Sequence, residues 1–172
     1  MSSSPDILLQ ASLFRVERIQ QTTAQGAIHS REVIRHPGAV VIVPLIDDDH
    51  VCLIQNHRVA VAQTLIELPA GTLEPGEDPR ETARRELAEE TGYRADTIEP
   101  LSAFYLSPGI LDERMHLFLA KGLTPGHAAQ EPGEEIDNLL TSYDEALRMV
   151  RDGRIQDAKT MVGLMWYCQF RA

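Results

Sequence analysis

The chain is poor in cysteine, with only Cys52 and Cys168 among its 172 residues. Two cysteines are too few for a disulfide framework, and their spacing fits no zinc site. We therefore expect two core thiols in a reducing cytoplasm. Long apolar runs are also missing, since no stretch approaches the ~18 consecutive residues of a membrane span. The first residues, Met1-Ser2-Ser3-Ser4-Pro5-Asp6, lack the basic and then apolar order of a signal peptide, so we expect a cytoplasmic protein with no membrane partner.

Positive charge is scarce as well. The chain carries 16 lysines and arginines against 26 aspartates and glutamates, which gives a formal net charge of -10. A protein that binds a nucleic-acid backbone needs a basic face, so this composition argues against a nucleic-acid partner. A small anionic substrate is not excluded, but it would need local cations, either a few arginines or metal ions.

The order of the predicted elements indicates one α+β domain and not a doubly wound sheet, in which strands and helices would alternate regularly. No repeat, low-complexity segment or long linker divides the chain. Apolar runs and alternation predict strands over about residues 12–20, 27–35, 38–46, 50–55, 65–69, 98–106 and 114–120. The strand over 38–46 is almost continuously apolar, which is typical of a strand buried on both faces.

Helix signals occur in the middle and at the end of the chain. Asp78 is a good cap for a helix that begins at Pro79 and should end at Gly92, a natural left-handed terminator. Ser142 and Glu145 form a second capping pattern, which opens a helix over about residues 143–151.

Asp157 can cap a last helix, and apolar residues recur along it at helical spacing. We interpret this stripe as core or subunit contact; its members are Met161, Leu164, Met165 and Cys168.

The helix that begins at Pro79 carries an unusual group of acids. Glu86 with Glu89, and Glu86 with Glu90, are three and four residues apart, so three carboxylates project from about one face. Like charges at this spacing destabilise an isolated helix by a few tenths of a kcal/mol each, so something should compensate them. A hard divalent cation with oxygen ligands is the simplest candidate. The alternative is a solvated acidic helix partly neutralised by Arg84 and Arg85.

Together with the loop before it, this helix resembles the Nudix box of the Nudix hydrolase family. The pattern is Gly-x5-Glu-x7-Arg-Glu-Leu-x-Glu-Glu-x-Gly-Tyr, and its matching fixed positions are Gly71, Glu77, Arg85, Glu86, Glu89, Glu90 and Gly92. By equal-frequency arithmetic, a given window meets such a pattern by chance on the order of once in 10⁹. Tyr93 departs mildly from the aliphatic residue that usually follows. The resemblance implies an α/β/α sandwich with a mixed sheet, which the N-terminal antiparallel strands precede.

The resemblance also implies Mg²⁺- or Mn²⁺-dependent hydrolysis of a nucleoside diphosphate linked to another moiety. In similar enzymes, the metal ligands correspond to Glu86 and Glu90, with Glu89 as a further ligand or as the base. A backbone carbonyl before the box glycine often completes the site, which indicates Ala70. The pair Glu77 and Arg85 is expected to hold the loop to the helix by an ion pair.

The segments beside the box are similar to those of the ADP-ribose pyrophosphatases. Before it stands Glu67-Leu68-Pro69-Ala70-Gly71, and Pro108 lies 16 residues beyond Gly92, at the position associated with that subfamily. Such enzymes are typically homodimers, in which N-terminal strands pack onto the partner. The resemblance therefore implies a dimerisation region over residues 1–36 and a Nudix hydrolase domain over residues 37–172.

The same resemblance supplies candidates for catalysis and substrate binding. In relatives, a glutamate on a late loop activates the nucleophilic water; Glu134 is the first candidate here, with Glu135 and Glu131 behind it. Glu113, in an earlier loop, is a further catalytic candidate. The substrate-binding candidates are Arg58, Arg31, Pro108 and Gly109. An arginine suits this task because its planar fork donates two hydrogen bonds to a phosphate.

Two other functions stay open. A different sugar nucleotide, such as GDP-mannose, would use the same chemistry, because specificity lies in pocket shape and a few polar groups. A non-catalytic, regulatory domain that binds a nucleotide sugar is the other alternative. The chain keeps every acid of the box, which favours an enzyme.

Overall fold

The computed structural model describes residues 6–129 and 135–170. The strands are β1 Asp6–Gln10, β2 Arg15–Thr22, β3 Ile28–Arg35, β4 Ala39–Pro44, β5 His50–Arg58, β6 Gln63–Glu67, β7 Ala70–Thr72, β8 Tyr93–Tyr105, β9 Arg114–Pro125 and β10 Ile136–Ser142. The helices are α1 Pro79–Thr91, α2 Tyr143–Arg151 and α3 Ala158–Phe170. In the described part of the chain, no helix is long and apolar enough to cross a membrane.

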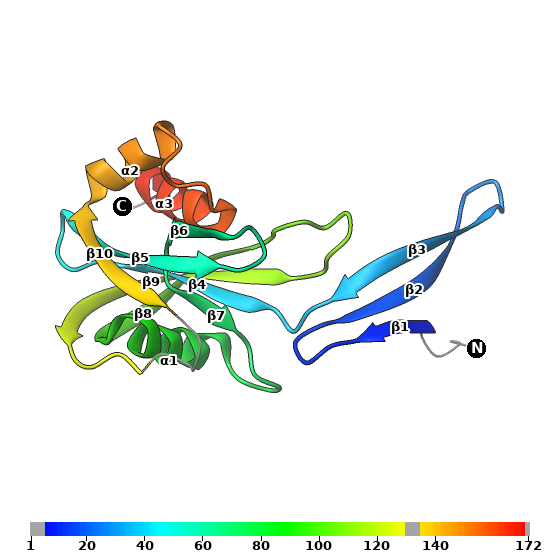
Figure 1. Ribbon diagram of the computed structural model, residues 1–172, viewed down its shortest axis with the longest axis horizontal. Coiled ribbons are helices and arrows are strands. Elements are labelled where there is room, and N and C mark those ends of the chain that lie inside the picture. Colours follow the sequence, from blue (N-terminus) through cyan, green and yellow to red (C-terminus); the bar gives the residue numbers. More distant parts are fainter. Residues whose placement is uncertain (1–5, 130–134, 171–172) are drawn as a thin grey trace.

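Two sheets form the body of the molecule. The four-stranded sheet has the order β7-β4-β9-β8 and is mixed, because β4 and β9 run parallel while its other pairs are antiparallel. The three-stranded sheet β10-β5-β6 is antiparallel. Helix α1 lies on one side of these sheets, and α2 and α3 lie on the other (Figure 1). The predicted α+β fold, an α/β/α sandwich with a mixed sheet, is confirmed.

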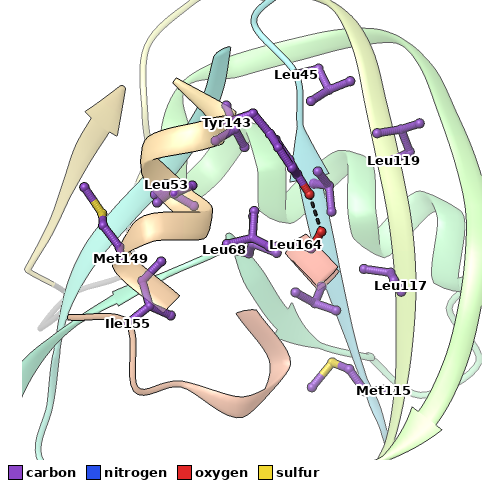
Figure 2. Close-up of a cluster of buried hydrophobic side chains, with 14 of the residues drawn as sticks. Leu45, Leu53, Leu68, Met115, Leu117, Leu119, Tyr143, Met149, Ile155 and Leu164 are labelled. Atoms are coloured by element: carbon purple, nitrogen blue, oxygen red, sulfur yellow. Dashed lines mark hydrogen bonds between the residues drawn. The ribbon is translucent and has the colours of Figure 1, made fainter. Parts of the chain in front are cut away.

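The core has one part on each side of β4. All six residues of β4 are buried, as its continuous apolar run predicts. One face of β4 packs with α2 and α3, and the other packs with Ala83 and Leu87 of α1. The hydroxyl of Tyr143 donates a hydrogen bond to the carbonyl of Leu164 and so joins α2 to α3 (Figure 2). Burial of a side chain such as Leu164 contributes roughly 1.5–3 kcal/mol.

Helix α1 begins and ends at the predicted residues. The carboxylate of Asp78 accepts a hydrogen bond from the backbone N–H of Arg80 at 2.8 Å, and Pro79 occupies the first helical position. Gly92 ends the helix with φ of 76°, a left-handed conformation that costs least without a Cβ. These local signals place the acidic face of the helix in a defined register.

Strands β1, β2 and β3 form a separate antiparallel sheet, which projects from the body as an arm (Figure 1). Its apolar side chains are largely exposed; they include Ile7, Leu8, Leu9 and Ile28. The arm joins the body at Asp112, whose carboxylate accepts hydrogen bonds from Arg35 at 3.0 Å and from the backbone of His36 at 2.8 Å.

One expectation about the two cysteines is wrong, and the apolar stripe on α3 is core only in part. Cys52 is buried, which raises the pKa of its thiol to about 12, but Cys168 is exposed. Only part of the predicted apolar stripe on α3 is core, because Leu164 is fully buried whereas Met165 is 59% exposed. The reason is geometric: α3 is buried along one side only, at Lys159, Thr160, Gly163 and Leu164, so Met165 lies outside the core.

Candidate active site

The cavity beside α1 has a volume of about 750 Å³ and is lined mainly by three parts of the chain. Strand β7 and the loop after it form one wall, the acidic face of α1 forms a second, and the base of the arm forms the third. The principal lining residues are Leu13, Phe14, Arg15, Arg35, Arg58, Ala70, Gly71, Glu74, Arg85, Glu86, Glu89, Glu90 and Asp112.

The three predicted glutamates of α1 all line this cavity. Glu90 is only 4% exposed, and one of its carboxylate oxygens accepts a hydrogen bond from the backbone N–H of Ala70 at 2.9 Å. Glu86 and Glu89 both lie beside the guanidinium of Arg85. The predicted convergence of Ala70 with the three acids is therefore present, because helical spacing puts the acids on one face and β7 runs past it.

Gly71 is required by this close approach. A Cβ atom at residue 71 would lie 1.8 Å from Cδ of Glu86. The strand can therefore pass the carboxylate only because residue 71 has no side chain.

Arg85 links the acids of the box. Its Nη1 atom lies 2.7 Å from Glu86 and 3.0 Å from Glu89, and its Nη2 atom lies 3.1 Å from Glu77. The hydrogen bonds from Arg85 lower the pKa of Glu77 to about 2, and the same bonds raise the pKa of Arg85 above its usual range. The predicted ion pair between loop and helix is thus present.

The donor set suits a hard divalent cation, because it consists of carboxylate oxygens and a backbone carbonyl. The approach of β7 to Glu86, possible only at a glycine, forms the cradle for such a site. In the described residues, however, no three acidic, histidine or cysteine side chains are grouped closely enough to hold a metal. Arg85 holds Glu86 and Glu89, so its contacts with them would have to loosen when an ion binds.

Arg58 also lines the cavity, but its guanidinium is already engaged. Its Nε and Nη2 atoms donate to the two oxygens of Glu67 at 2.8 and 2.7 Å. Glu67 is 1% exposed, and its second partner is Lys159. An arginine is charged at any physiological pH, and the hydrogen bonds to Glu67 raise the pKa of Arg58 further.

The arm supplies a part of the cavity that the sequence analysis missed. Leu13 and Phe14 give it an apolar wall, and Arg15 and Arg35 bring positive charge. Both arginines bind the buried carboxylate of Glu17, at 2.6 and 2.8 Å. One signal could have found Arg35, because alternation along β3 puts it on the same face as the candidate Arg31.

Several predicted site residues do not line the cavity. Arg31 is exposed on β3, and Pro108 and Gly109 are exposed in the connection between β8 and β9. Glu113 lies 3.7 Å from the ring of His36 and does not line the cavity.

Of the three glutamates predicted in the late loop, the structure describes only one. Glu135 is exposed just before β10, and Glu131 and Glu134 lie outside the described residues.

Comparison with known proteins agrees with the geometry. The family model for the NUDIX domain matches residues 35–162. A methanol dehydrogenase activator from Bacillus methanolicus is 40% identical over 143 residues, and an ADP-ribose pyrophosphatase from Bacillus subtilis is 37% identical over 143 residues; each match covers 82% of this chain and 77% of the relative. A GDP-mannose pyrophosphatase from Cronobacter sakazakii is 39% identical over 153 residues, which cover 83% of this chain and 79% of the relative.

A solved structure of an ADP compounds hydrolase superposes with a TM-score of 0.83. The match covers 98% of this chain and 94% of the other, at 24% identity, and so supports the fold alone.

Proposed function

The chain belongs to the Nudix hydrolase family, and from this premise we propose that it hydrolyses the pyrophosphate bond of ADP-ribose, or of a related nucleoside diphosphate sugar, to AMP and ribose 5-phosphate. The observation that carries the proposal is a single cavity that is lined both by the box acids Glu86, Glu89 and Glu90 and by Phe14 and Arg35 of the arm. Similarity to an ADP-ribose pyrophosphatase over most of both chains supports the choice of substrate.

Glu86, Glu89, Glu90 and the carbonyl of Ala70 would hold Mg²⁺, with Mn²⁺ as a substitute. When bound, the cation neutralises charge on the pyrophosphate and so makes it open to attack by water. Ala70 is well placed for this role, since its own N–H is bound to Glu90 and its position beside α1 is therefore fixed.

The protein's cations would bind the diphosphate, and its apolar wall the nucleoside. Arg58 keeps its charge and lines the cavity, which suits contact with a phosphate oxygen. The ring of Phe14 suits stacking on a base, and Arg15 and Arg35 add positive charge near it.

For the proton transfer from water we propose Glu134, with Glu135, Glu113 and Glu89 as the alternatives. Only Glu89 of these four lies on the described wall of the cavity. Arg31, Pro108 and Gly109 stay candidates for substrate contacts.

The arm over residues 1–36 is proposed to pair two copies of the chain, with 37–172 as the hydrolase domain. Its exposed Ile7 and Leu9 support this, because a second copy would remove them from water. Light scattering should then report a dimer, and Ile7→Lys with Leu9→Lys should give a monomer. A monomeric unmodified protein would contradict the pairing. We also retain the proposal of a cytoplasmic location, which the free thiols of Cys52 and Cys168 support.

A second candidate substrate is GDP-mannose, favoured by the relative of that activity. The test is product analysis with ADP-ribose, ADP-glucose, GDP-mannose and NADH, each with and without Mg²⁺. Metal-dependent release of AMP that is fastest from ADP-ribose would support the proposal. Fastest turnover of GDP-mannose would support the second candidate, and no turnover of any of them would favour a binding domain.

A further inference from the structure

The sequence has only two lysines, and they differ sharply in environment. Lys121 is exposed on β9, whereas Lys159 is 7% exposed in the first turn of α3. A buried lysine needs close anionic partners, because burial disfavours its charge. The ammonium of Lys159 has two: it contacts the carboxylate of Glu67 and lies 3.0 Å from that of Asp157.

Lys159 shares Glu67 with Arg58. This carboxylate is the most deeply buried charge of the cluster, and it lies between the guanidinium on β5 and the ammonium on α3. Burial alone would raise the pKa of Glu67, but the hydrogen bonds from Arg58 and the charge of Lys159 together outweigh burial and lower it. Glu67 is therefore ionised, and its single negative charge is paired with two positive charges, those of Arg58 and Lys159.

Of this group of four charged residues, a positively charged one faces the cavity. Arg58, Lys159, Glu67 and Asp157 sum to zero charge, but Arg58 is the one of these four that lines the cavity. Without Lys159, Glu67 would be paired with Arg58 alone and would cancel its charge at that wall. The effect is strong at this place because Glu67 and Lys159 are shielded from water.

The same turn of α3 also fixes the backbone. The hydroxyl of Thr160 accepts a hydrogen bond from the N–H of Leu68 at 2.8 Å and donates one to Asp157 at 2.6 Å. The hydroxyl of Thr160 is neutral, so a substitution there removes no charge near Arg58. The role of this turn in fixing the backbone can therefore be tested apart from the role of the Lys159 charge.

We propose that Lys159 is a positioning residue that sets the affinity for the diphosphate of the substrate, because it occupies Glu67 and leaves the charge of Arg58 available to a phosphate. The inference rests on the proposed function in that the ligand is a nucleoside diphosphate. It adds a buried residue outside the cavity to those that determine substrate affinity.

The test compares Lys159→Met with the double variant Glu67→Gln/Lys159→Met. Methionine matches the apolar stem of lysine, and glutamine matches glutamate in shape, so the double variant removes both charges with little change in volume. Two readouts are used: binding of ADP by calorimetry in EDTA, and kcat and KM for ADP-ribose with Mg²⁺. Lys121→Met is the matched control, because it removes the other lysine from an exposed site with a 3.5 Å contact to Glu99.

We expect Lys159→Met to weaken ADP binding and raise KM by roughly 5- to 10-fold, with kcat within about twofold. The double variant should recover both values to within about twofold, because Arg58 is then freed from a carboxylate. Lys121→Met should match the unmodified protein. Thr160→Val removes the hydroxyl's hydrogen bonds to Leu68 and Asp157 but no charge, so it should lower Tm and leave KM unchanged.

Three results would overturn the inference. Unchanged KM in Lys159→Met would do so, as would an equal rise of KM in Thr160→Val or a failure of the double variant to recover. If the unmodified protein neither binds ADP nor hydrolyses a nucleotide sugar, the proposed function fails together with the inference. If it does both while Lys159→Met behaves like it, only the inference fails.

Discussion

The Cβ position of Gly71 lies 1.8 Å from Cδ of Glu86, so strand β7 and the acidic helix α1 meet where no side chain fits. The atom that this Cβ would contact is at the far end of the flexible side chain of Glu86. An added methyl group would therefore displace the carboxylate and leave the backbone where it is.

Gly71→Ala should lower kcat/KM by about 100-fold or more, since a misplacement near 1 Å at a reacting centre has effects of that size. Tm should change by less than about 4 °C, which corresponds to roughly 1 kcal/mol for a chain of this size. Steady-state kinetics and thermal unfolding measure the two effects. In a Glu86→Ala background the same substitution should cost nothing further; an equal loss there would show that Gly71 acts by another route.

Glu90→Gln should abolish most turnover with the fold kept. The amide oxygen of glutamine can still accept the hydrogen bond from the N–H of Ala70, whereas the negative charge is lost. We expect kcat to fall by at least about 100-fold. Glu81→Gln, on the exposed side of the same helix, is the control. Near-normal turnover of Glu90→Gln at saturating Mg²⁺ would refute its assignment as a ligand.

Glu134→Gln should lower kcat by about 100- to 10,000-fold with little change in substrate affinity, as expected when a general base is removed. Glu135→Gln, Glu113→Gln and Glu89→Gln are compared in the same assay, with kcat and KM determined separately. If only Glu135→Gln or Glu113→Gln has the large effect on kcat, the base belongs there and not at Glu134; a loss in Glu89→Gln is also expected from its role as a metal ligand.

Local signals predicted the part of the fold that carries the chemistry. The cap at Asp78, the terminator at Gly92 and the spacing of the acids lie within one short segment, so its conformation follows from nearby residues. The same is true of the cap at Ser142, whose hydroxyl accepts a hydrogen bond from the N–H of Glu145 at 3.2 Å.

Long-range pairing could not be predicted in this way. Strand β10 was not predicted, because it has no clear apolar run. It forms by pairing with β5, about 85 residues earlier in the chain. Arg58 was expected to contact a phosphate, but its pairing with the buried Glu67 was not predicted, nor was the contact of Glu67 with Lys159, 92 residues further along the chain. The contribution of Phe14 to the cavity depends on how the arm meets the body, for which no local pattern exists.

Arg85→Gln should increase the stabilisation that Mg²⁺ gives. Arg85 compensates Glu86 and Glu89 in the protein without metal, so a cation has to displace it from them. Removing Arg85 leaves the carboxylates to repel one another, and we expect Tm in EDTA to fall by several degrees and the shift on adding Mg²⁺ to exceed that of the unmodified protein. Thermal unfolding with and without Mg²⁺ measures both. Arg84→Gln, which removes the neighbouring arginine, should give the ordinary shift; an ordinary shift in Arg85→Gln as well would contradict the idea.

The ion pair between Glu77 and Arg85 should give stability a dependence on acid pH. Arg85 lowers the pKa of Glu77 from 4.5 to about 2, so the folded state binds this proton less readily than the unfolded state does. The stabilisation is therefore present above pH ~4.5 and is lost as the pH falls from there through about 2. Glu77→Gln imitates the protonated acid, and it should lower Tm near pH 7 by roughly 2–8 °C, or about 1–2 kcal/mol. The gap in Tm between the two proteins should then narrow steadily below pH ~4.5 and close near pH 2. A gap that stays constant across this range would mean that Glu77 stabilises the loop by its shape and not by its charge.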